Sequence, residues 1–174
     1  MTSLTDVGFM EMRIGKVVAL AQGQDHPSFC VVLQGSDQDV QLPIQIGQAE
    51  ALSLSATLTG VPFGRPMSPQ FAAGLLHALG GRVREVRIDR LVEVRGGTAY
   101  GATVEVEGPS GAARVDARPS DALNLAALLP APVLVAPEVL ADARSRLEGD
   151  SPEAAVLRRA VEADPMTIER PGGR

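Results

Sequence analysis

The chain has 174 residues, a formal net charge of -5, no tryptophan and one cysteine. This length fits one domain with a short tail, and a lone cysteine excludes an internal disulfide. The negative charge excludes a general attraction to polyanions, so any contact with DNA or RNA requires a local basic patch. No apolar stretch is long enough to span a bilayer, and the first residues lack the pattern of a signal peptide. We therefore expect a cytoplasmic protein with no membrane partner.

The first part of the chain predicts an antiparallel meander of three strands. Apolar and β-branched residues dominate 10–20 and 29–33, and residues 40–46 alternate between apolar and polar side chains. Polar, turn-forming residues over 22–27 and 34–37 separate these stretches. Short turns between strand patterns are typical of strands that pair with their neighbours in sequence.

Two helices are predicted next. Residues 48–59 are rich in alanine and leucine and contain no glycine or proline. Ser68 is expected to cap a second helix, with Pro69 in its first position and the end of the helix at Gly80. Helical spacing predicts a row of apolar residues on the core side of this helix: Phe71, Leu75, Leu76 and Leu79.

The second half of the chain predicts another antiparallel meander, followed by helices. Strand patterns cover 86–94, 100–106 and 113–117, and Gly96-Gly97 is a hairpin signal. Helices are predicted over 119–129, 137–147 and 153–163, with a short strand over 132–135.

These patterns predict a single α+β domain, in which two small, mainly antiparallel sheets pack with three to four helices. We expect a flexible N-terminal arm over 1–9 and the domain itself over 10–148. The remaining residues, 149–174, are expected to form a C-terminal tail that is partly helical or disordered.

Two segments are distinctive enough to suggest a family. Leu42 to Ala51 and Asp116 to Ala122 resemble, in the same order and at a similar separation, the signature segments of the bifunctional nuclease (BFN) domain family. Between them, Arg65-Pro66 and the hairpin segment 97–102 also resemble that family. The resemblance covers about Met10 to Leu140. It implies an α+β fold, self-association and nuclease activity on DNA and RNA.

The chain departs from the family pattern in two places. Members usually have Thr-His-Asp where this chain has Ser68-Pro69-Gln70, and an aromatic residue where it has Gln45. If the missing histidine or aspartate takes part in the chemistry, this protein is a weakened or silent member.

The junction from Asp116 to Asp121 carries the chemistry that we expect. A helix that starts after it offers free N–H groups and the positive end of its dipole. In the structural interpretation, Arg118 pairs with the aspartates and Ser120 caps the helix. In the functional interpretation, Arg118, Ser120 and the helix end bind a phosphate, and Asp116 and Asp121 are ligands for Mg²⁺ or Mn²⁺.

Two further residues extend this candidate site. Glu50 follows Gly47 at the start of a helix, where an acidic residue is favourable without any function. In the functional interpretation Glu50 joins Asp116 or Asp121 in a carboxylate cluster. Arg65, in a loop, either clamps an internal carboxylate or meets a ligand phosphate.

Other reactive groups give weaker signals. Cys30, in an apolar run, is expected to be a buried small hydrophobe, and His26 and His77 show no spacing that pairs them. One basic cluster is interleaved with acidic residues, so we expect a salt-bridged solvent face rather than a nucleic-acid track. Its arginines are Arg82, Arg84, Arg87, Arg90 and Arg95.

Two functional hypotheses follow. The first is a metal-assisted nuclease of the DNase/RNase type that hydrolyses phosphodiester bonds, without an organic cofactor. Its catalytic residues are Glu50, Asp116 and Asp121, and its substrate-binding residues are Arg65, Arg118 and Ser120. The alternative is a non-catalytic module on the same scaffold that binds a ligand or a protein. The exposed sheet edges also suggest a homo-oligomer.

Overall fold

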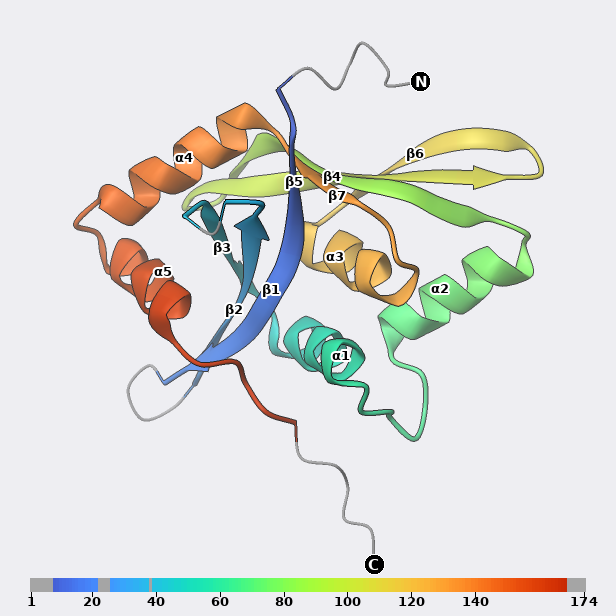
Figure 1. The fold of residues 1–174 in the computed structure, drawn as a ribbon, viewed down its shortest axis with the longest axis horizontal. Helices are drawn as coiled ribbons and strands as arrows, with labels where there is room; N and C mark the ends of the chain where they lie inside the picture. Colours follow the sequence, from blue (N-terminus) through green and yellow to red (C-terminus); the bar gives the residue numbers. More distant parts are fainter. Residues whose placement is uncertain (1–7, 22–25, 38, 169–174) are drawn as a thin grey trace, which may run out of the picture.

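The computed structural model describes residues 8–21, 26–37 and 39–168. In this part of the chain the fold is α+β, with five helices packed around one mixed sheet of seven strands (Figure 1). The α+β class is therefore as the sequence predicts. The expectation of two small sheets is wrong, because all seven strands belong to one sheet.

The two predicted meanders are present as halves of that sheet. The first pairs β1 (Met10–Leu20), β2 (Ser28–Gly35) and β3 (Gln41–Ile46) in antiparallel order. The second pairs β4 (Arg82–Val94), β5 (Gly97–Gly108) and β6 (Gly111–Ala117) in the same way. Bulges in β4 between Val83 and Glu85 and between Ile88 and Arg90 shift its register against β5.

A short strand joins the halves. β7 (Val133–Val135) lies between β1 and β4, antiparallel to the first and parallel to the second, so the strand order is β3-β2-β1-β7-β4-β5-β6. The sequence predicts β7 as a strand, but periodicity does not indicate its two partners. Its pairing with both meanders is the physical reason for one sheet.

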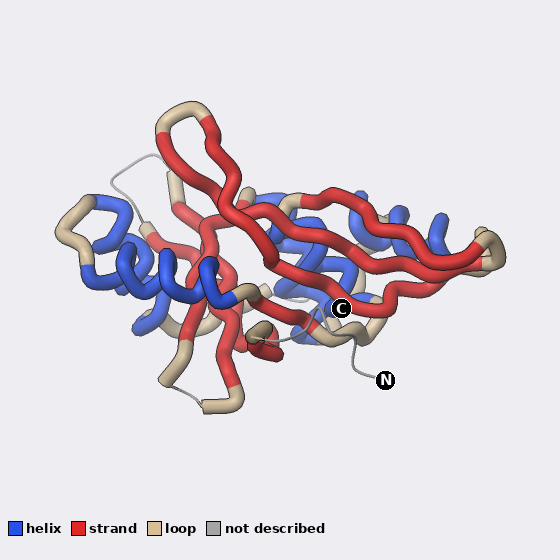
Figure 2. Tube along the Cα trace, turned by 90° about the horizontal axis from the view of Figure 1, so that it is seen from above, coloured by secondary structure: helices blue, strands red, loops and turns tan. Residues whose placement is uncertain are grey.

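The helices follow the predicted order. They are α1 (Gln48–Thr59), α2 (Ser68–Ala78), α3 (Pro119–Leu128), α4 (Pro137–Glu148) and α5 (Pro152–Glu162). Helix α3 packs on β4 and β5 and against α1 and α2, whereas α5 packs on β1, β2 and β3 (Figure 2). Among the described residues, no helix is long and apolar enough to cross a membrane.

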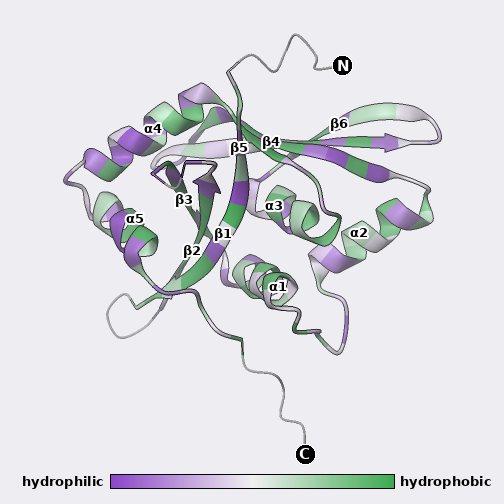
Figure 3. Cartoon of the chain, viewed as in Figure 1, coloured by the Kyte–Doolittle hydropathy of each residue, from purple (hydrophilic) through white to green (hydrophobic). Residues whose placement is uncertain are grey.

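The core between these layers is aliphatic, as the composition predicts. The largest fully buried side chains include Leu33, Leu54, Ile88 and Leu123. Hydrophobic residues run along the central strands and the inner sides of α1 and α3 (Figure 3). A second, smaller cluster lies under α5, where Ala160 packs with residues of β1 and β2.

Helix α2 differs from its prediction. Ser68 does not cap it, because the helix begins at Ser68 itself and no side chain caps its start. Of the four residues expected on the core side, Leu76 packs against the core, but Phe71, Leu75 and Leu79 are 61%, 49% and 74% exposed. The helix packs against α3, and Ala73 is the one residue of this helix that is buried. Helical spacing therefore identified an apolar row that this fold leaves uncovered.

The ends of the chain are described in part. Residues 1–7 of the expected arm and 169–174 of the expected tail lie outside the described residues. Within the tail, α5 is held by Lys16, whose Nζ donates hydrogen bonds to the carbonyl oxygens of Val161 and Ala163. Lys16 is the one lysine of the sequence, and its cation lies at the negative end of the helix dipole.

Cys30 is fully buried on β2, and burial raises the pKa of its thiol to about 11. We expect iodoacetamide at pH ~8 to leave the native protein unmodified and to alkylate it fully in guanidinium, because the thiolate is the reactive form. Because the pKa of the Cys30 thiol is higher in the folded than in the unfolded protein, where it is roughly 8.5, the protonated thiol stabilises the folded state. This stabilisation is complete below the unfolded pKa and is lost as the pH rises through the folded pKa. Rapid alkylation of the native protein, followed by mass spectrometry, would contradict this assignment.

Candidate functional site

The junction between β6 and α3 starts the helix at Pro119, as its sequence predicts, but the cap expected from Ser120 is absent, because Ser120 lies inside the first turn and no side chain caps the helix. Arg118 is the residue before the helix, with an extended backbone (φ -74°, ψ 149°), and Pro119 begins the first turn. The fixed backbone angle of proline suits this position, where its missing N–H costs no helical hydrogen bond. The side chain of Arg118 therefore leaves the chain at the amino-terminal end of α3.

Arg118 binds two carboxylates from different helices. Its Nε and Nη2 donate to Asp121 Oδ2 and Oδ1 at 2.7 and 3.0 Å, and Nη2 also donates to Glu50 Oε1 at 2.8 Å. The side chains of Arg118, Asp121 and Glu50 are 67%, 43% and 18% exposed. Hydrogen bonds to Asp121 and then to Glu50 raise the pKa of Arg118, so it stays cationic at any physiological pH. We call these three residues the Arg118 cluster.

Two residues that the sequence analysis did not assign to the site support the position of Glu50. The buried amide of Asn124 donates to the carbonyl oxygens of Glu50 and Ser120, at 3.1 and 2.9 Å, and so ties α3 to the start of α1. Gly47 precedes α1, and a Cβ at that position would collide with the Glu50 carboxylate. The one feature of the sequence that could have assigned Gly47 to the site is its place in the first signature segment.

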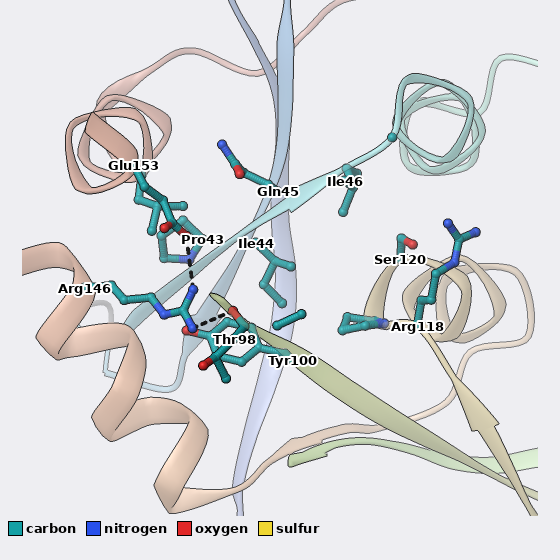
Figure 4. Close-up of a pocket in the computed structure, with 14 residues that line it drawn as sticks. Pro43, Ile44, Gln45, Ile46, Thr98, Tyr100, Arg118, Ser120, Arg146 and Glu153 are labelled. Atoms are coloured by element: carbon teal, nitrogen blue, oxygen red, sulfur yellow. Dashed lines mark hydrogen bonds and ion pairs between the residues drawn. The ribbon is translucent and has the colours of Figure 1, made fainter. Parts of the chain in front are cut away.

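A hollow of about 410 Å³ opens beside the cluster. β3 and the β4–β5 hairpin supply its middle, and the start of α3 supplies one side, where Arg118 and Ser120 lie (Figure 4). Ile44 and Ile46 lie between that side and the opposite wall, which comes from α4 and α5 (Figure 4). The hollow is thus largely apolar along its middle, with a guanidinium on each side.

Arg146 forms the opposite wall, and sequence reasoning missed it. It pairs with Asp142 and Glu153, donates to the carbonyl oxygen of Thr98 at 2.8 Å and lies 5.1 Å from the ring centre of Tyr100. Burial opposes its charge, but Tyr100, Asp142 and Glu153 together raise the pKa of Arg146. These contacts join α4 to α5 and to the β4–β5 hairpin.

Tyr100 completes this wall. Its hydroxyl donates to Asp142 Oδ2 at 2.9 Å. Burial, and then this hydrogen bond, raise the pKa of Tyr100, so the hydroxyl stays protonated. We call Thr98, Tyr100, Asp142, Arg146 and Glu153 the Arg146 wall. Arg146 is paired within this wall and is less exposed than Arg118.

The remaining predicted site residues lie elsewhere. Asp116 is 87% exposed and pairs with Arg90 on the face of β6 opposite Ala117, so it does not join the Arg118 cluster. Arg65 lines a separate hollow of about 400 Å³ between α1 and α2. The structure brings together Glu50, Arg118, Ser120 and Asp121, and it does not bring Asp116 or Arg65 to them.

The departure from the family pattern has a visible structural role. Gln70 lines the same hollow as Arg65, and its Nε2 donates to Ser53 Oγ at 3.1 Å. A neutral amide that links α1 to α2 therefore occupies the place where the family usually has an acid.

The described carboxylates do not fit a metal cage made by the protein alone. Asp116 and Asp121 belong to separate ion pairs, with Arg90 and Arg118. In the described part of the chain, no three histidine, cysteine, aspartate or glutamate side chains come close enough to hold a metal ion.

The basic residues of β4 form the salt-bridged face that the interleaved acids predict. Arg82 pairs with Glu107 at 2.6 Å, Arg87 pairs with Glu85, and Arg90 pairs with Asp89 and Asp116. Their cross-strand partners place all three arginines on one side of the strand, because the two bulges offset their spacing. The interpretation as a salt-bridged face open to solvent is confirmed for Arg82 and Arg90, but it is wrong for Arg87, which is salt-bridged but buried, with its guanidinium 5.1 Å from the ring centre of Phe9.

Comparisons with known proteins agree with the signature segments. A profile described as the bifunctional nuclease domain matches residues 31–148. Proteins from two strains of Mycobacterium tuberculosis, both described as uncharacterized, are 33% identical to this chain over 138 residues, which is 79% of this chain and 79% of each relative. The profile match includes every residue of the Arg118 cluster and of the Arg146 wall except Glu153.

Replacing Arg146 should loosen the carboxy-terminal helices. We expect Arg146→Ala to lower the free energy of unfolding by about 2 kcal/mol, since it leaves the part-buried Asp142 without its cation. Urea denaturation measures the effect, and Arg144→Ala, which removes an exposed arginine from the same helix, is the control. Equal stability of the two variants would show that the wall does not hold these elements together.

Proposed function

Because the chain belongs to the bifunctional nuclease domain family, we propose that it hydrolyses phosphodiester bonds in DNA or RNA, with the phosphate bound at the Arg118 cluster. The observation that carries this proposal is a solvent-open guanidinium between two carboxylates at the start of a helix, beside a hollow of about 410 Å³. Pockets that hold small ligands span roughly 300–1,000 Å³.

Phosphate binding is the first step of the proposal. Arg118 uses Nε and Nη2 for its carboxylates, and Nη1 makes no hydrogen bond within the described residues. Guanidinium forks bind phosphate oxygens through paired N–H groups, and the helix start adds free N–H groups and a positive dipole end. Asp121 is more exposed than Glu50, so it is the carboxylate that can release Arg118 to the substrate.

Activation of water is the second step. A carboxylate beside a bound phosphate can accept a proton from an attacking water, and Glu50 and Asp121 both lie against the same guanidinium. The water oxygen bonds to phosphorus while Arg118 stabilises the negative charge that develops on the phosphate. The P–O bond to the leaving alkoxide then breaks, and the carboxylate returns its proton to that oxygen. Magnesium usually binds one or two carboxylates together with substrate phosphates, so we include dependence on Mg²⁺ or Mn²⁺ in the proposal.

The other predicted arginine has a separate place in the proposal. Arg65 is exposed and forms no ion pair within the described residues. It would therefore contact a different phosphate of the strand, away from the reacting one. Binding through two isolated arginines on a chain of net charge -5 should be weak and sensitive to salt.

A second function is favoured by the pairing of charges. The two carboxylates already neutralise Arg118, and Gln70 is neutral where the family usually has an acid. These two observations support a non-catalytic module that binds a small anion or a protein at the same hollow.

Purified protein should be incubated with single-stranded DNA and RNA, with Mg²⁺ or Mn²⁺ and with chelator. We expect cleavage that Arg118→Ala or Asp121→Asn lowers at least ~100-fold, because each removes a group that acts on the reacting phosphate. Matched controls are Arg84→Ala, which removes an exposed arginine of β4, and Glu138→Gln, which changes the first-turn acid of α4. Far-UV circular dichroism checks that all four variants fold.

The outcomes separate the two functions. Cleavage that persists in both site variants would contradict catalysis at the Arg118 cluster. No cleavage by the native protein, with phosphate or nucleotide binding that Arg118→Ala removes, would establish the binding module instead.

A further inference from the structure

The hollow beside the Arg118 cluster lies along a free edge of the sheet. β3 is an edge strand, so it is paired on one side only, with β2. Successive residues from Pro43 to Ile46 line the hollow, although their side chains alternate between the two faces of the sheet. A hollow that touches both faces of an edge strand includes the edge itself, where backbone groups have no neighbouring strand.

The register of β3 shows which of its backbone groups are open. Gly35 donates its N–H to the carbonyl oxygen of Val40 at 2.9 Å, and hydrogen-bonded pairs then alternate along the two strands. Residues 42, 44 and 46 therefore bond to β2, whereas Pro43 and Gln45 direct their backbone groups outward. Pro43 has no N–H, and neither backbone group of Gln45 has another partner within the described residues. Gln45 thus presents one donor and one acceptor to the hollow.

One donor beside one acceptor matches the edge of a nucleobase. The Watson–Crick edges of bases carry donors next to acceptors, and proteins bind unstacked bases through these edges. A peptide strand added to β3 would instead need such groups at every second residue of the edge. Pro43, two positions before Gln45, lacks the donor, so this edge suits a base better than a peptide.

The walls of the hollow suit the flat ring of a base. Ile44, Ile46 and Leu157 line it with aliphatic side chains, and Tyr100 contributes an aromatic ring. The hydrogen bond from the Tyr100 hydroxyl to Asp142 fixes that ring in place. Proteins bind bases by stacking on aromatic side chains and by contact with apolar ones. The apolar middle of the hollow is thus matched to a base, and the guanidinium of Arg118 at its side is matched to a phosphate.

We propose that the hollow is a nucleobase subsite, in which the base attached to the bound phosphate forms hydrogen bonds with the backbone of Gln45. This inference rests on the proposed function, since that function places the phosphate at Arg118. A base within a duplex has its Watson–Crick edge occupied by the other strand. The protein therefore takes unpaired nucleotides, and a free mononucleotide fills the same subsite.

Calorimetry with the native, full-length protein tests for the base subsite. Inorganic phosphate and ribose 5-phosphate fill the phosphate site alone, whereas AMP also carries a base. We expect AMP to bind at least ~10-fold more tightly than ribose 5-phosphate, because only AMP gains the apolar and edge contacts. Equal affinities of these two ligands would overturn the base subsite, even if Arg118→Ala abolishes the binding of both.

Two substitutions at Gln45 separate its backbone from its side chain. Gln45→Pro removes the outward N–H, and the bonds to β2 remain because that N–H takes no part in them. Gln45→Ala is the reference: it keeps the N–H and removes the side chain, whose amide points away from Tyr100 (Figure 4). We expect Gln45→Pro to bind AMP about tenfold more weakly than Gln45→Ala does, and both to bind ribose 5-phosphate equally.

A second variant keeps the test decisive if Gln45→Pro does not fold, as circular dichroism will show. Ala99→Leu places extra volume in the hollow, so it should weaken AMP and leave inorganic phosphate bound. Ala112→Leu, at an exposed position of β6, is the matched control. AMP binding that the folded hollow variants leave unchanged would overturn the inference.

Cleavage assays keep this inference apart from the proposed function. Tight binding of AMP through the Gln45 N–H, without any cleavage, would support the base subsite and overturn the nuclease proposal. In the presence of cleavage, we expect single-stranded substrate to react at least ~10-fold faster than a duplex of the same sequence. Equal rates, with cleavage that still depends on Arg118, would overturn the base subsite and keep the nuclease.

Discussion

The structure depends on the three residues of β7. Val133 and Val135 are buried, and the strand pairs with β1 on one side and β4 on the other. Each meander would otherwise end in an open edge, and the apolar faces of the two meanders would have no common core. The backbone groups of β7 pair with those of β1 on one side and of β4 on the other, so both open edges are hydrogen-bonded. The two antiparallel meanders thereby become a single sheet.

This union creates the candidate site. The hollow takes residues of β3 from the first meander and residues of the β4–β5 hairpin from the second, with α3 and α4 on its two sides. Arg118 precedes β7 in the chain and Arg146 follows it, so they come from elements on either side of the central strand in sequence. The two arginines lie in different surroundings, one open to solvent and one enclosed by Asp142, Glu153 and Tyr100.

The ion pairs of the Arg118 cluster agree with the structural interpretation and are compatible with the proposed phosphate site. The cluster links the starts of α1 and α3, as an internal ion pair would. Solvent-exposed ion pairs contribute little to stability, with typical values of about 0–1 kcal/mol, so under the proposed function a phosphate would replace the exposed Asp121 at small cost. The buried Asn124 would keep the two helices in place, because its hydrogen bonds do not involve the arginine.

The sequence by itself determined the order of helices and strands, the two hairpins and the family, because turns and signature segments are local. It proposed six site residues, and the tertiary structure brings together four of them: Glu50, Arg118, Ser120 and Asp121. Only the tertiary structure decided that β7 joins both meanders, that α2 leaves Phe71 and Leu79 exposed, and that Arg146 faces Arg118 across a hollow. It also placed Asp116 on the other face of β6 and Arg65 in a separate hollow. These outcomes depend on which distant elements meet, and periodicity, being a property of neighbouring residues, carries no information about that choice.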